Sequence, residues 1–310
     1  MLRARPALLL ASALAVPALV AGCSATSAAD DDGTVQVLAS FYPLQMIAQE
    51  VGGDRVSVES LTPPGAEPHD VELSPAQVAK VSDADLVLYL SGFQAAVDDA
   101  LAQAEPRDAL DAADATTLLS GDGEEHDHAE DEEEGHDHGD ADPHFWLDPS
   151  RMPAVADAVA EHLSELDPDG AQEFAANAAA LDERFAALDE AYRTGLAECG
   201  IRTFVTSHTA FGYLAHRYDL EEVGISGIDP EAEPSPARLA EVSDVVRDEG
   251  VTTLFFETLV SPKVAETLAQ DLGVQTAVLD PIEGLADDDA DYFSIADDNL
   301  EALRVALSCS

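Results

Sequence analysis

Four residues of this chain have side chains that bind metal ions and stand where a metal site can form. They are His69, His144, His208 and Asp280. His69, His208 and Asp280 each follow a short apolar run typical of a buried strand, and His144 lies in a short proline-flanked motif. In open parallel sheets, ligands bind beyond the carboxyl ends of the strands, so these side chains can converge. Three imidazoles and one carboxylate make a four-coordinate set that suits Zn²⁺.

Each candidate also has an ordinary explanation, because a single histidine after a strand is more often an exposed loop residue than a ligand. Four such positions at equivalent strand ends favour a shared site. His162 and His216 lie within predicted helices without convergent partners, so we assign both to surface or packing roles.

Glu257 ends a further predicted strand, and we interpret it as an acceptor that orients a ligand imidazole. The alternative is a general base in a zinc hydrolase, which would need an open coordination position. The chain has no His-Glu-x-x-His helix, and a fourth protein ligand at Asp280 closes the site.

The motif around His144 differs sharply from the segment before it. Residues 143–149 read Pro-His-Phe-Trp-Leu-Asp-Pro and include the only tryptophan, Trp146, so we expect a packed and rigid segment. From Asp122 to Asp142, by contrast, the chain has twelve acidic residues and four histidines, with no large apolar residue. Residues 121–142 are therefore expected to form a disordered, solvated loop.

The loop histidines come in two His-Asp-His pairs and predict weak, auxiliary metal binding. They are His126, His128, His136 and His138. Ordering so mobile a segment costs entropy, so these residues are not expected to form the tight site. The loop either collects metal for the cleft or is a solvated insertion without a role in transport.

The first 23 residues have the composition of an export signal. Two arginines precede an apolar run over residues 7–20, which is too short to span a membrane. Residues 20–23, Val-Ala-Gly-Cys, resemble a bacterial lipobox, which implies that Cys23 becomes an acylated first residue. The alternative is a plain secretory signal with an incidental cysteine. A flexible tether is expected over residues 24–33.

The formal net charge of −49 restricts the possible partners. Nucleic acid and bare anionic membrane are repelled by such a charge, whereas cations are attracted. Much of the acidity is also explained by solubility in salt.

Short apolar runs alternate with helical patterns along the rest of the chain. Strands are predicted at residues 35–39, 56–61, 86–90, 203–206, 222–225, 253–257 and 275–279. Helices are predicted at residues 43–50, 75–82, 94–103, 152–166, 211–218, 236–249, 262–272 and 290–307. Strands separated by helices predict an α/β fold with parallel sheets that carry helices on both faces.

Residues 169–198 predict one long amphipathic helix, because apolar residues recur there at steps of four and three. They are Phe174, Ala178, Leu181, Phe185, Leu188, Tyr192 and Leu196. Such a helix is about 45 Å long and can run along two lobes. We therefore predict an N-terminal lobe at residues 34–166, a linking helix at 167–199 and a C-terminal lobe at 200–310.

Several motifs together resemble the zinc-binding lipoproteins of bacterial ABC importers. These are the signal with its lipobox, Gly65 to His69, the acidic His-rich insertion before His144, Thr206 to Leu214, Phe256-Glu257 and Leu279-Asp280-Pro281. The resemblance covers essentially the whole mature chain, in the order of the family. One departure is Pro68, where some zinc members have an acidic residue, and contact of Glu67 with metal stays open.

The resemblance implies two α/β lobes joined by a rigid helix, with Zn²⁺ in the cleft between them. It also implies delivery of the metal to a membrane permease driven by a cytoplasmic ATPase. The protein would be exported, monomeric, and anchored to the outer face of the cell membrane through Cys23. Manganese relatives carry a carboxylate at position 208, so the third imidazole favours zinc. A manganese-type protein of the same fold and an adhesin lipoprotein are the remaining alternatives.

Cys199 and Cys309 are the only other cysteines of the chain. Both would lie outside the cytoplasm, where disulfides persist, and we predict that they pair. The alternative is two separate thiols.

Overall fold

The computed structural model describes residues 33–104, 106–120, 141–287 and 289–310, and residues 33–310 form one compact unit. Outside the described residues lie the predicted signal, Cys23, most of the tether and the four loop histidines. Among the described helices, none combines the length and the apolar composition that crossing a bilayer requires.

The chain forms two four-stranded sheets in which all strands are parallel. The first contains β1 (Val35–Ala39), β2 (Val56–Ser60), β3 (Leu86–Tyr89) and β4 (Ala109–Asp111), in the order β2-β1-β3-β4. The second contains β5 (Thr203–Thr206), β6 (Glu221–Gly224), β7 (Thr253–Phe256) and β8 (Gln275–Val278), in the order β6-β5-β7-β8. The two sheets thus share one strand order, and the predicted α/β class with two parallel-sheet lobes is confirmed.

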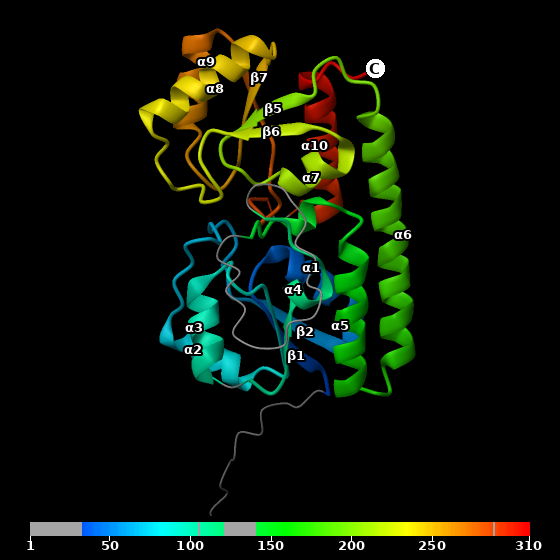
Figure 1. Cartoon of the computed structure of the whole chain (residues 1–310). Coiled ribbons are helices and arrows are strands. Elements are labelled where there is room, and N and C mark those ends of the chain that lie inside the picture. Colours follow the sequence, from blue (N-terminus) through cyan, green and yellow to red (C-terminus); the bar gives the residue numbers. More distant parts are fainter. Residues whose placement is uncertain (1–32, 105, 121–140, 288) are drawn as a thin grey trace, which may run out of the picture. The chain divides into compact units, whose positions relative to one another are not determined.

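Ten helices in the described residues cover the two sheets (Figure 1). The first lobe has α1 (Tyr42–Gly52), α2 (Pro75–Asp83), α3 (Ala95–Ala104), α4 (Ala112–Ala115) and α5 (Met152–Leu166), with 3-10 turns η1 (Gly53–Arg55) and η2 (Phe145–Leu147). The second has α7 (Gly212–Tyr218), α8 (Pro236–Asp248), α9 (Lys263–Leu272) and α10 (Tyr292–Ala306), and α6 (Ala171–Gly195) lies between the lobes in sequence. The predicted elements end within three residues of the observed ones. Among the strands and α-helices of the described residues, only the short β4 and α4, with three and four residues, were not predicted.

The strands bury alternate residues on opposite faces of each sheet, as the two-residue period of a strand requires. In β1, Val37 packs in the core that includes α1, α5 and α6, whereas Leu38 packs on the other face with residues of α2 and α3. In β5, Phe204 belongs to the same large core, and Val205 packs against α8 and α9. One continuous core therefore lies along the inner faces of both sheets.

Helix α6 runs beside both lobes (Figure 1). Its apolar stripe is buried, as the pattern predicts, and packs against α1 and α5 of the first lobe and α10 of the second. Asn177 donates a hydrogen bond to the carbonyl of Val51 at 2.9 Å, and Tyr192 donates one to the carbonyl of Ala296 at 2.6 Å. Its 25 residues span about 37 Å. The helix thus contacts both lobes along its length.

A disulfide joins Cys199, just after α6, to Cys309 near the C-terminus, 110 residues further along the chain. The backbone beside it is also paired, because Ile201 N donates to the carbonyl of Leu307 at 3.0 Å. The end of α6 is thereby connected to the end of α10. In the chain-entropy model, closing a loop of this length stabilises the fold by about 4–5 kcal/mol.

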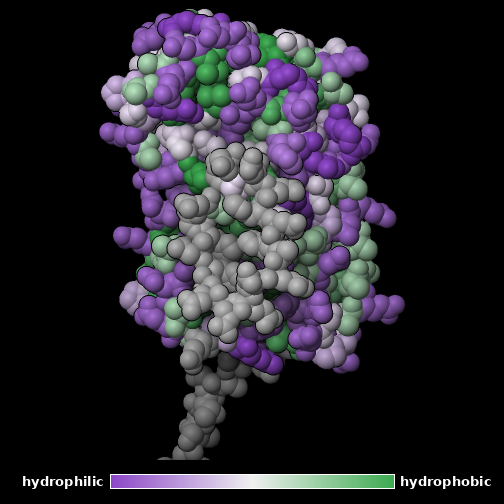
Figure 2. Space-filling view, in the orientation of Figure 1, coloured by the Kyte–Doolittle hydropathy of each residue, from purple (hydrophilic) through white to green (hydrophobic). Residues whose placement is uncertain are grey.

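Hydrophilic residues make up most of the coloured part of the face in Figure 2, as the acidic composition leads one to expect. Few large apolar side chains are exposed in the described part of the chain, and Val305, on α10, is the most exposed of them at 71%. The sheets and the helices around them therefore bury nearly all large apolar groups.

Candidate metal centre

Four loops bring ligand-type side chains together at the carboxyl ends of the two sheets. The first lobe contributes His69, between β2 and α2, and His144, at the start of η2. The second contributes His208, between β5 and α7, and Glu283, in the segment between β8 and α10. Each residue can place one ligand atom within 4.8 Å of the others. Two loops from each lobe thus meet at one point.

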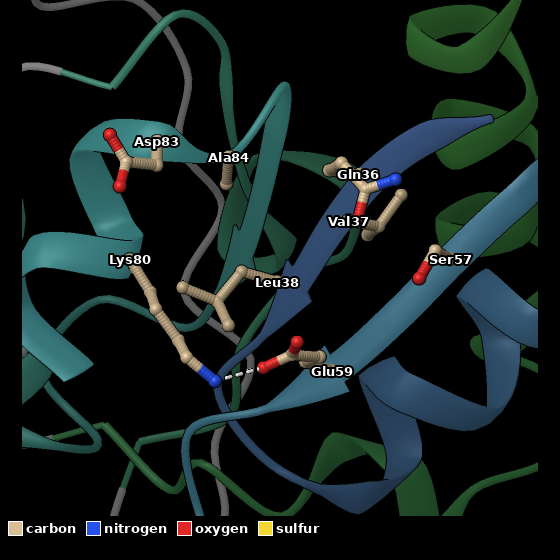
Figure 3. A pocket seen from close by; sticks show the side chains of 8 residues that line it. All are labelled: Gln36, Val37, Leu38, Ser57, Glu59, Lys80, Asp83 and Ala84. Carbon is tan, nitrogen blue, oxygen red and sulfur yellow. Dashed lines mark hydrogen bonds and ion pairs between the residues drawn. The ribbon is translucent and has the colours of Figure 1, made fainter. Parts of the chain in front are cut away.

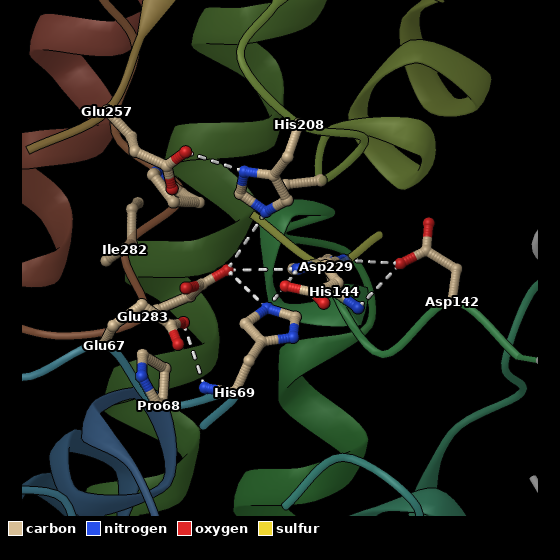
Figure 4. A network of polar contacts seen from close by, with 12 residues as sticks. Glu67, Pro68, His69, Asp142, His144, His208, Asp229, Glu257, Ile282 and Glu283 are labelled. Carbon is tan, nitrogen blue, oxygen red and sulfur yellow. Dashed lines mark hydrogen bonds and ion pairs between the residues drawn. The ribbon is translucent and has the colours of Figure 1, made fainter. Parts of the chain in front are cut away.

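The three imidazoles direct their Nε2 atoms at one carboxylate oxygen, Oε1 of Glu283 (Figure 4). The distances to this oxygen are 3.0 Å from His144, 3.4 Å from His69 and 3.6 Å from His208. The Nε2 atoms of His69 and His144 are 3.3 Å apart. In a tetrahedral zinc site with bonds of 2.0–2.2 Å, neighbouring ligand atoms are about 3.3–3.6 Å apart. Four of the six distances between these donor atoms thus lie within about 0.3 Å of the tetrahedral range.

Two buried atoms of this cluster have no hydrogen-bond partner among the described residues, namely Nε2 of His208 and Oε2 of Glu283. Buried polar atoms are normally paired, so unpaired atoms within a cluster of ligand-type side chains fit a metal site. His144, His208 and Glu283 are at most 1% exposed, whereas the side chain of His69 is 10% exposed. The centre is therefore nearly closed, and His69 is the member closest to solvent.

The electrostatics of the cluster are those of cationic imidazoles around a carboxylate. Burial raises the pKa of Glu283, but the three imidazoles around its carboxylate outweigh burial and hold this pKa well below its usual range. Burial lowers the pKa of His144, yet Asp142 and Glu283 together raise it to about 9. In His208, burial is outweighed by Glu257 and Glu283, which raise the pKa to about 10. A metal cation that replaced these protons would keep the same balance of charge.

Two imidazoles are oriented by a second carboxylate on their other nitrogen. Nδ1 of His144 lies 2.7 Å from Oδ1 of Asp142, and Nδ1 of His208 lies 2.9 Å from Oε1 of Glu257. Glu257 Oε1 also accepts a hydrogen bond from Ser207 Oγ at 2.8 Å. A carboxylate accepts hydrogen bonds, so in each neutral imidazole Nδ1 carries the proton and Nε2 is left free to bind metal. Glu257 therefore has the contact that the sequence analysis assigned to it.

Both first-lobe histidines occur in the same local sequence, acid-Pro-His. The backbone N–H of His69 donates to Glu67 Oε1 at 2.9 Å, and that of His144 donates to Asp142 Oδ1 at 3.0 Å. Glu67 also accepts from the backbone of Asp70 at 3.1 Å, so its carboxylate closes the turn that carries His69. Glu67 is not in the group of ligand-type residues.

The sequence analysis assigned the carboxylate of the cluster to Asp280, and the structure places Glu283 there instead. Asp280 is buried, but its Oδ1 accepts from the backbone of Ile282 at 2.8 Å and its Oδ2 accepts from Thr258 Oγ1 at 2.6 Å. The chain turns after Asp280, and the turn directs Glu283 toward the imidazoles. A second acid three residues after Asp280 was the only sequence signal. The turn that brings Glu283 into the cluster cannot be predicted from the sequence pattern.

The structure also tests the predictions for Asp142, His162 and His216. Asp142 was assigned to the solvated loop, but it is 4% exposed and its N–H donates to the carbonyl of Leu119 at 2.9 Å. Asp142 is thus fixed in place, because Leu119 accepts from its N–H and Tyr213 donates to its carbonyl. His162 pairs with Asp108 at 2.8 Å on the surface, and His216 is exposed, so neither lies in the cluster.

Glu222 is a half-buried residue beside this centre, with one carboxylate oxygen fully buried, that the sequence analysis did not identify. Its Oε1 accepts from Thr206 Oγ1 at 2.9 Å and from the backbone N–H groups of Ala210 and Phe211 at 3.1 and 3.0 Å. These residues flank His208, so Glu222 holds the loop that carries it. An acidic residue on an edge strand looks like a solvent-facing position, which is why the pattern did not reveal it.

A separate surface pocket of about 150 Å³ lies on β1, β2 and α2 (Figure 3). An ion pair between Lys80 and Glu59 borders it. Its lining includes neither a histidine nor a cysteine. It therefore lacks the chemistry of the histidine cluster.

Two parallel α/β lobes that meet at a small enclosed cluster of ligand side chains define the class of solute-binding proteins. Within this class, the chain belongs to the ZnuA family, whose description is "Zinc-uptake complex component A periplasmic" and whose model matches residues 37–306.

Curated relatives and solved structures agree with this assignment. The chain is 39% identical over 307 residues to the zinc-binding lipoprotein AdcA of Streptococcus pneumoniae, an alignment that covers 96% of this chain and 60% of AdcA. The chain thus spans about three-fifths of the length of that relative. It is 34% identical over 301 residues to the high-affinity zinc uptake system protein ZnuA of Bacillus subtilis, covering 93% of this chain and 94% of that protein.

Among solved structures, the Zn(II)-bound ZnuA-like domain of S. pneumoniae AdcA superimposes with a TM-score of 0.74 at 35% identity, covering 89% of this chain and 99% of that domain. The laminin-binding protein Lmb of Streptococcus agalactiae, described as bifunctional with adhesin and metal transporting activity, gives a TM-score of 0.77 at 34% identity. That match covers 88% of this chain and 99% of Lmb.

Proposed function

We propose that this protein captures Zn²⁺ outside the cytoplasm and delivers it to the permease of an ABC importer. The observation that carries the proposal is the convergence of three imidazole nitrogens and one carboxylate oxygen at tetrahedral spacing. The ion is the cargo of the protein. The ligand set is His69, His144, His208 and Glu283.

Zinc is favoured over manganese by the composition of this set. Mn²⁺ prefers oxygen ligands, whereas imidazole nitrogen suits Zn²⁺. The cluster offers three nitrogens and one carboxylate, and His208 supplies the nitrogen that distinguishes it from an oxygen-richer set. The relatives named for zinc uptake are consistent with this choice.

The residues around the ligands prepare them for capture. Asp142 and Glu257 hold the Nδ1 protons of His144 and His208, so both Nε2 lone pairs face the same point. Because the pKa values of these imidazoles are raised, capture of the ion displaces protons from Nε2. The negative charge of Glu283 then offsets part of the charge of the ion.

A hydrolase fits the same geometry poorly. Catalytic zinc sites keep one position open for water, but here a fourth protein ligand, Glu283, completes the set. Glu257, the candidate general base, is engaged by His208 and Ser207. The centre gives adhesion no role, so we do not extend the adhesin activity of Lmb to this chain.

Release of the ion must open a cluster that contacts between the lobes keep closed. Trp146 Nε1 donates to the carbonyl of Pro281 at 2.7 Å, which connects the His144 segment to the Glu283 segment. Tyr213, on α7, donates to the carbonyl of Asp142 at 2.7 Å and accepts from the backbone of Leu119 at 2.7 Å. Docking on the permease would supply the energy that separates these contacts.

The remaining parts of the chain support delivery at a membrane. Acylation of Cys23 would tether the protein, as a monomer, to the outer face of the cell membrane beside a permease with its cytoplasmic ATPase. The loop histidines between residues 126 and 138 would bind additional Zn²⁺ weakly. Both features lie outside the described residues and remain predictions.

Zinc titration in competition with a chromophoric chelator tests the proposal. We expect one tight equivalent and a change in the fluorescence of Trp146, whose ring lies 5.2 Å from that of His144. A variant that lacks residues 123–139 should keep the tight equivalent and lose the weak ones. Absence of a tight equivalent in both proteins would refute zinc capture by this cluster.

A further inference from the structure

The turn that carries Glu283 has an unusual backbone. Ile282, directly before Glu283, has φ = 58°, in the left-handed region. β-Branched residues are genuine outliers there because their side chains crowd the backbone, and such residues persist only where the surroundings enforce them. Something must therefore hold this turn.

Asp280 supplies that constraint through four hydrogen bonds, which join it to Ile282, to Thr258 and to Asn299. Its Oδ1 accepts from the N–H of Ile282 at 2.8 Å, and its Oδ2 accepts from Thr258 Oγ1, just after β7, at 2.6 Å. Asn299 of α10 accepts from the backbone N–H of Asp280 at 2.8 Å and donates to its carbonyl at 2.7 Å. Asp280 is thus fixed to α10 and to the segment after β7, while it folds the backbone of Ile282.

The neighbouring residues are equally constrained. The carbonyl of Pro281 accepts from Trp146 Nε1, and the side chain of Ile282 is 1% exposed. In contrast, Glu283 Oε2 has no hydrogen-bond partner among the described residues. Apart from the imidazoles that face its Oε1, the direction of the Glu283 carboxylate therefore depends on the turn that precedes it.

We propose that Asp280, held by Thr258 and Asn299, is a positioning residue that directs Glu283 at the imidazoles without binding the ion itself. This inference rests on the proposed zinc capture and deepens it. Both oxygens of the Asp280 carboxylate are already used, so its role is to shape the turn.

Two substitutions at this position separate positioning from ligation. Asp280→Ala removes both side-chain acceptors, and zinc affinity should fall about 10–100-fold, as for other residues that orient ligands. Asp280→Asn keeps an oxygen for Ile282 N–H and places an amide beside Thr258 Oγ1, so it should recover most of that loss. A ligand would behave differently, because Asn lacks the charge and should bind zinc as poorly as Ala. Equal losses in the two variants would overturn the proposal.

Further variants separate a local role from general destabilisation. Thr258→Val removes one of the hydrogen bonds that hold Asp280 and should weaken zinc binding severalfold. Asp287→Ala is the matched control, because Asp287 closes a similar turn by accepting from Asp289 N–H at 3.0 Å and is exposed. It should leave affinity unchanged. Wild-type affinity in both Asp280→Ala and Thr258→Val would also overturn the proposal.

The visible spectrum of the Co²⁺-substituted protein distinguishes a positioning role of Asp280 from a role in stability alone. If Asp280→Ala displaces Glu283, the visible spectrum of bound Co²⁺ should change, since it reports coordination geometry. An unchanged spectrum together with a lower unfolding temperature would show that Asp280 serves only stability. Glu283→Gln distinguishes the two proposals: if this variant binds zinc like the parent, the ligand set itself fails, whatever Asp280 does.

Discussion

The two lobes contribute equally to the metal centre but hold their ligands by different means. In the first lobe, His69 and His144 are each positioned by an acid two residues earlier in the chain. In the second, His208 is oriented by Glu257, 49 residues away, and Glu283 follows a turn fixed by contacts to Thr258 and Asn299. The first half of the site is thus built locally, and the second half depends on the packing of distant elements.

This difference shows how one site can combine ligands held by a local turn with ligands whose positions depend on distant elements. A local acid-Pro-His turn needs few other contacts, because proline restricts the backbone and the acid closes the turn. The second-lobe ligands require β5, β7, β8 and α10 to be in place. Substitutions far from the ligands should therefore affect zinc binding more often in the second lobe than in the first.

The largest effect is expected from removing any ligand, in either half. We predict that each single substitution lowers zinc affinity by about 100-fold or more, since four ligands share about 10–16 kcal/mol and each tenfold step is 1.4 kcal/mol. The variants are His69→Ala, His144→Ala, His208→Ala and Glu283→Gln. Chelator competition measures the affinities, with His162→Ala and His216→Ala as controls. A variant that binds like the parent would remove its residue from the ligand set.

The next effect compares the residues that orient the imidazoles. Asp142→Ala and Glu257→Ala should each weaken zinc binding about 10–100-fold, because each frees an imidazole that acts as a ligand. Glu67→Ala should cost less, since among the described residues Glu67 accepts hydrogen bonds from the backbone of His69 and Asp70 and from no imidazole ring. Calorimetry of the three variants tests this order. Equal losses for all three would mean that orientation of Nδ1 is not the decisive contribution.

Metal preference should depend on the second-lobe imidazole. His208→Glu exchanges a nitrogen for a harder oxygen, so zinc affinity should fall more than manganese affinity, and the ratio of the two should narrow about tenfold. Parallel titrations of parent and variant with both ions measure this ratio. If both affinities fell by the same factor, position 208 would not control selectivity.

The smallest effect concerns Glu222, which holds the His208 loop. Burial raises its pKa to about 7, although Phe211 N–H and Thr206 Oγ1 donate to it. Folded Glu222 therefore keeps a proton between pH 4.5 and 7 that the unfolded chain releases, so its contribution to the free energy of unfolding falls as pH rises through this window. Glu222→Gln cannot ionise. The stability of the variant relative to the parent should rise by about 1–3 kcal/mol from pH 4.5 to pH 7.

Urea unfolding of both metal-free proteins across this pH range measures the difference. Zinc affinity of Glu222→Gln should change only severalfold, because the amide can still accept from Phe211 N–H. Curves that stay parallel from pH 4.5 to pH 7 would show that Glu222 is ionised throughout.

The sequence by itself determined the α/β class, the long helix and three of the four clustered side chains. Each depends on a local pattern: apolar runs of strand length, the three-and-four spacing in α6, and histidines in the loops that follow strands or inside a proline motif. The signals are local because hydrogen bonding and burial repeat with the period of each element. His69 and His144 also carry their supporting acids beside them in the chain.

Only the tertiary structure decided between Asp280 and Glu283. Both are acids after β8, and the choice depends on Ile282 adopting a left-handed conformation that its own side chain disfavours. Asp280 contacts Thr258, 22 residues before it, and Asn299, 19 residues after it, and these contacts make the conformation of Ile282 stable. Long-range contacts of this kind leave no periodic trace in the sequence, because they join residues whose separation follows from the topology of the fold.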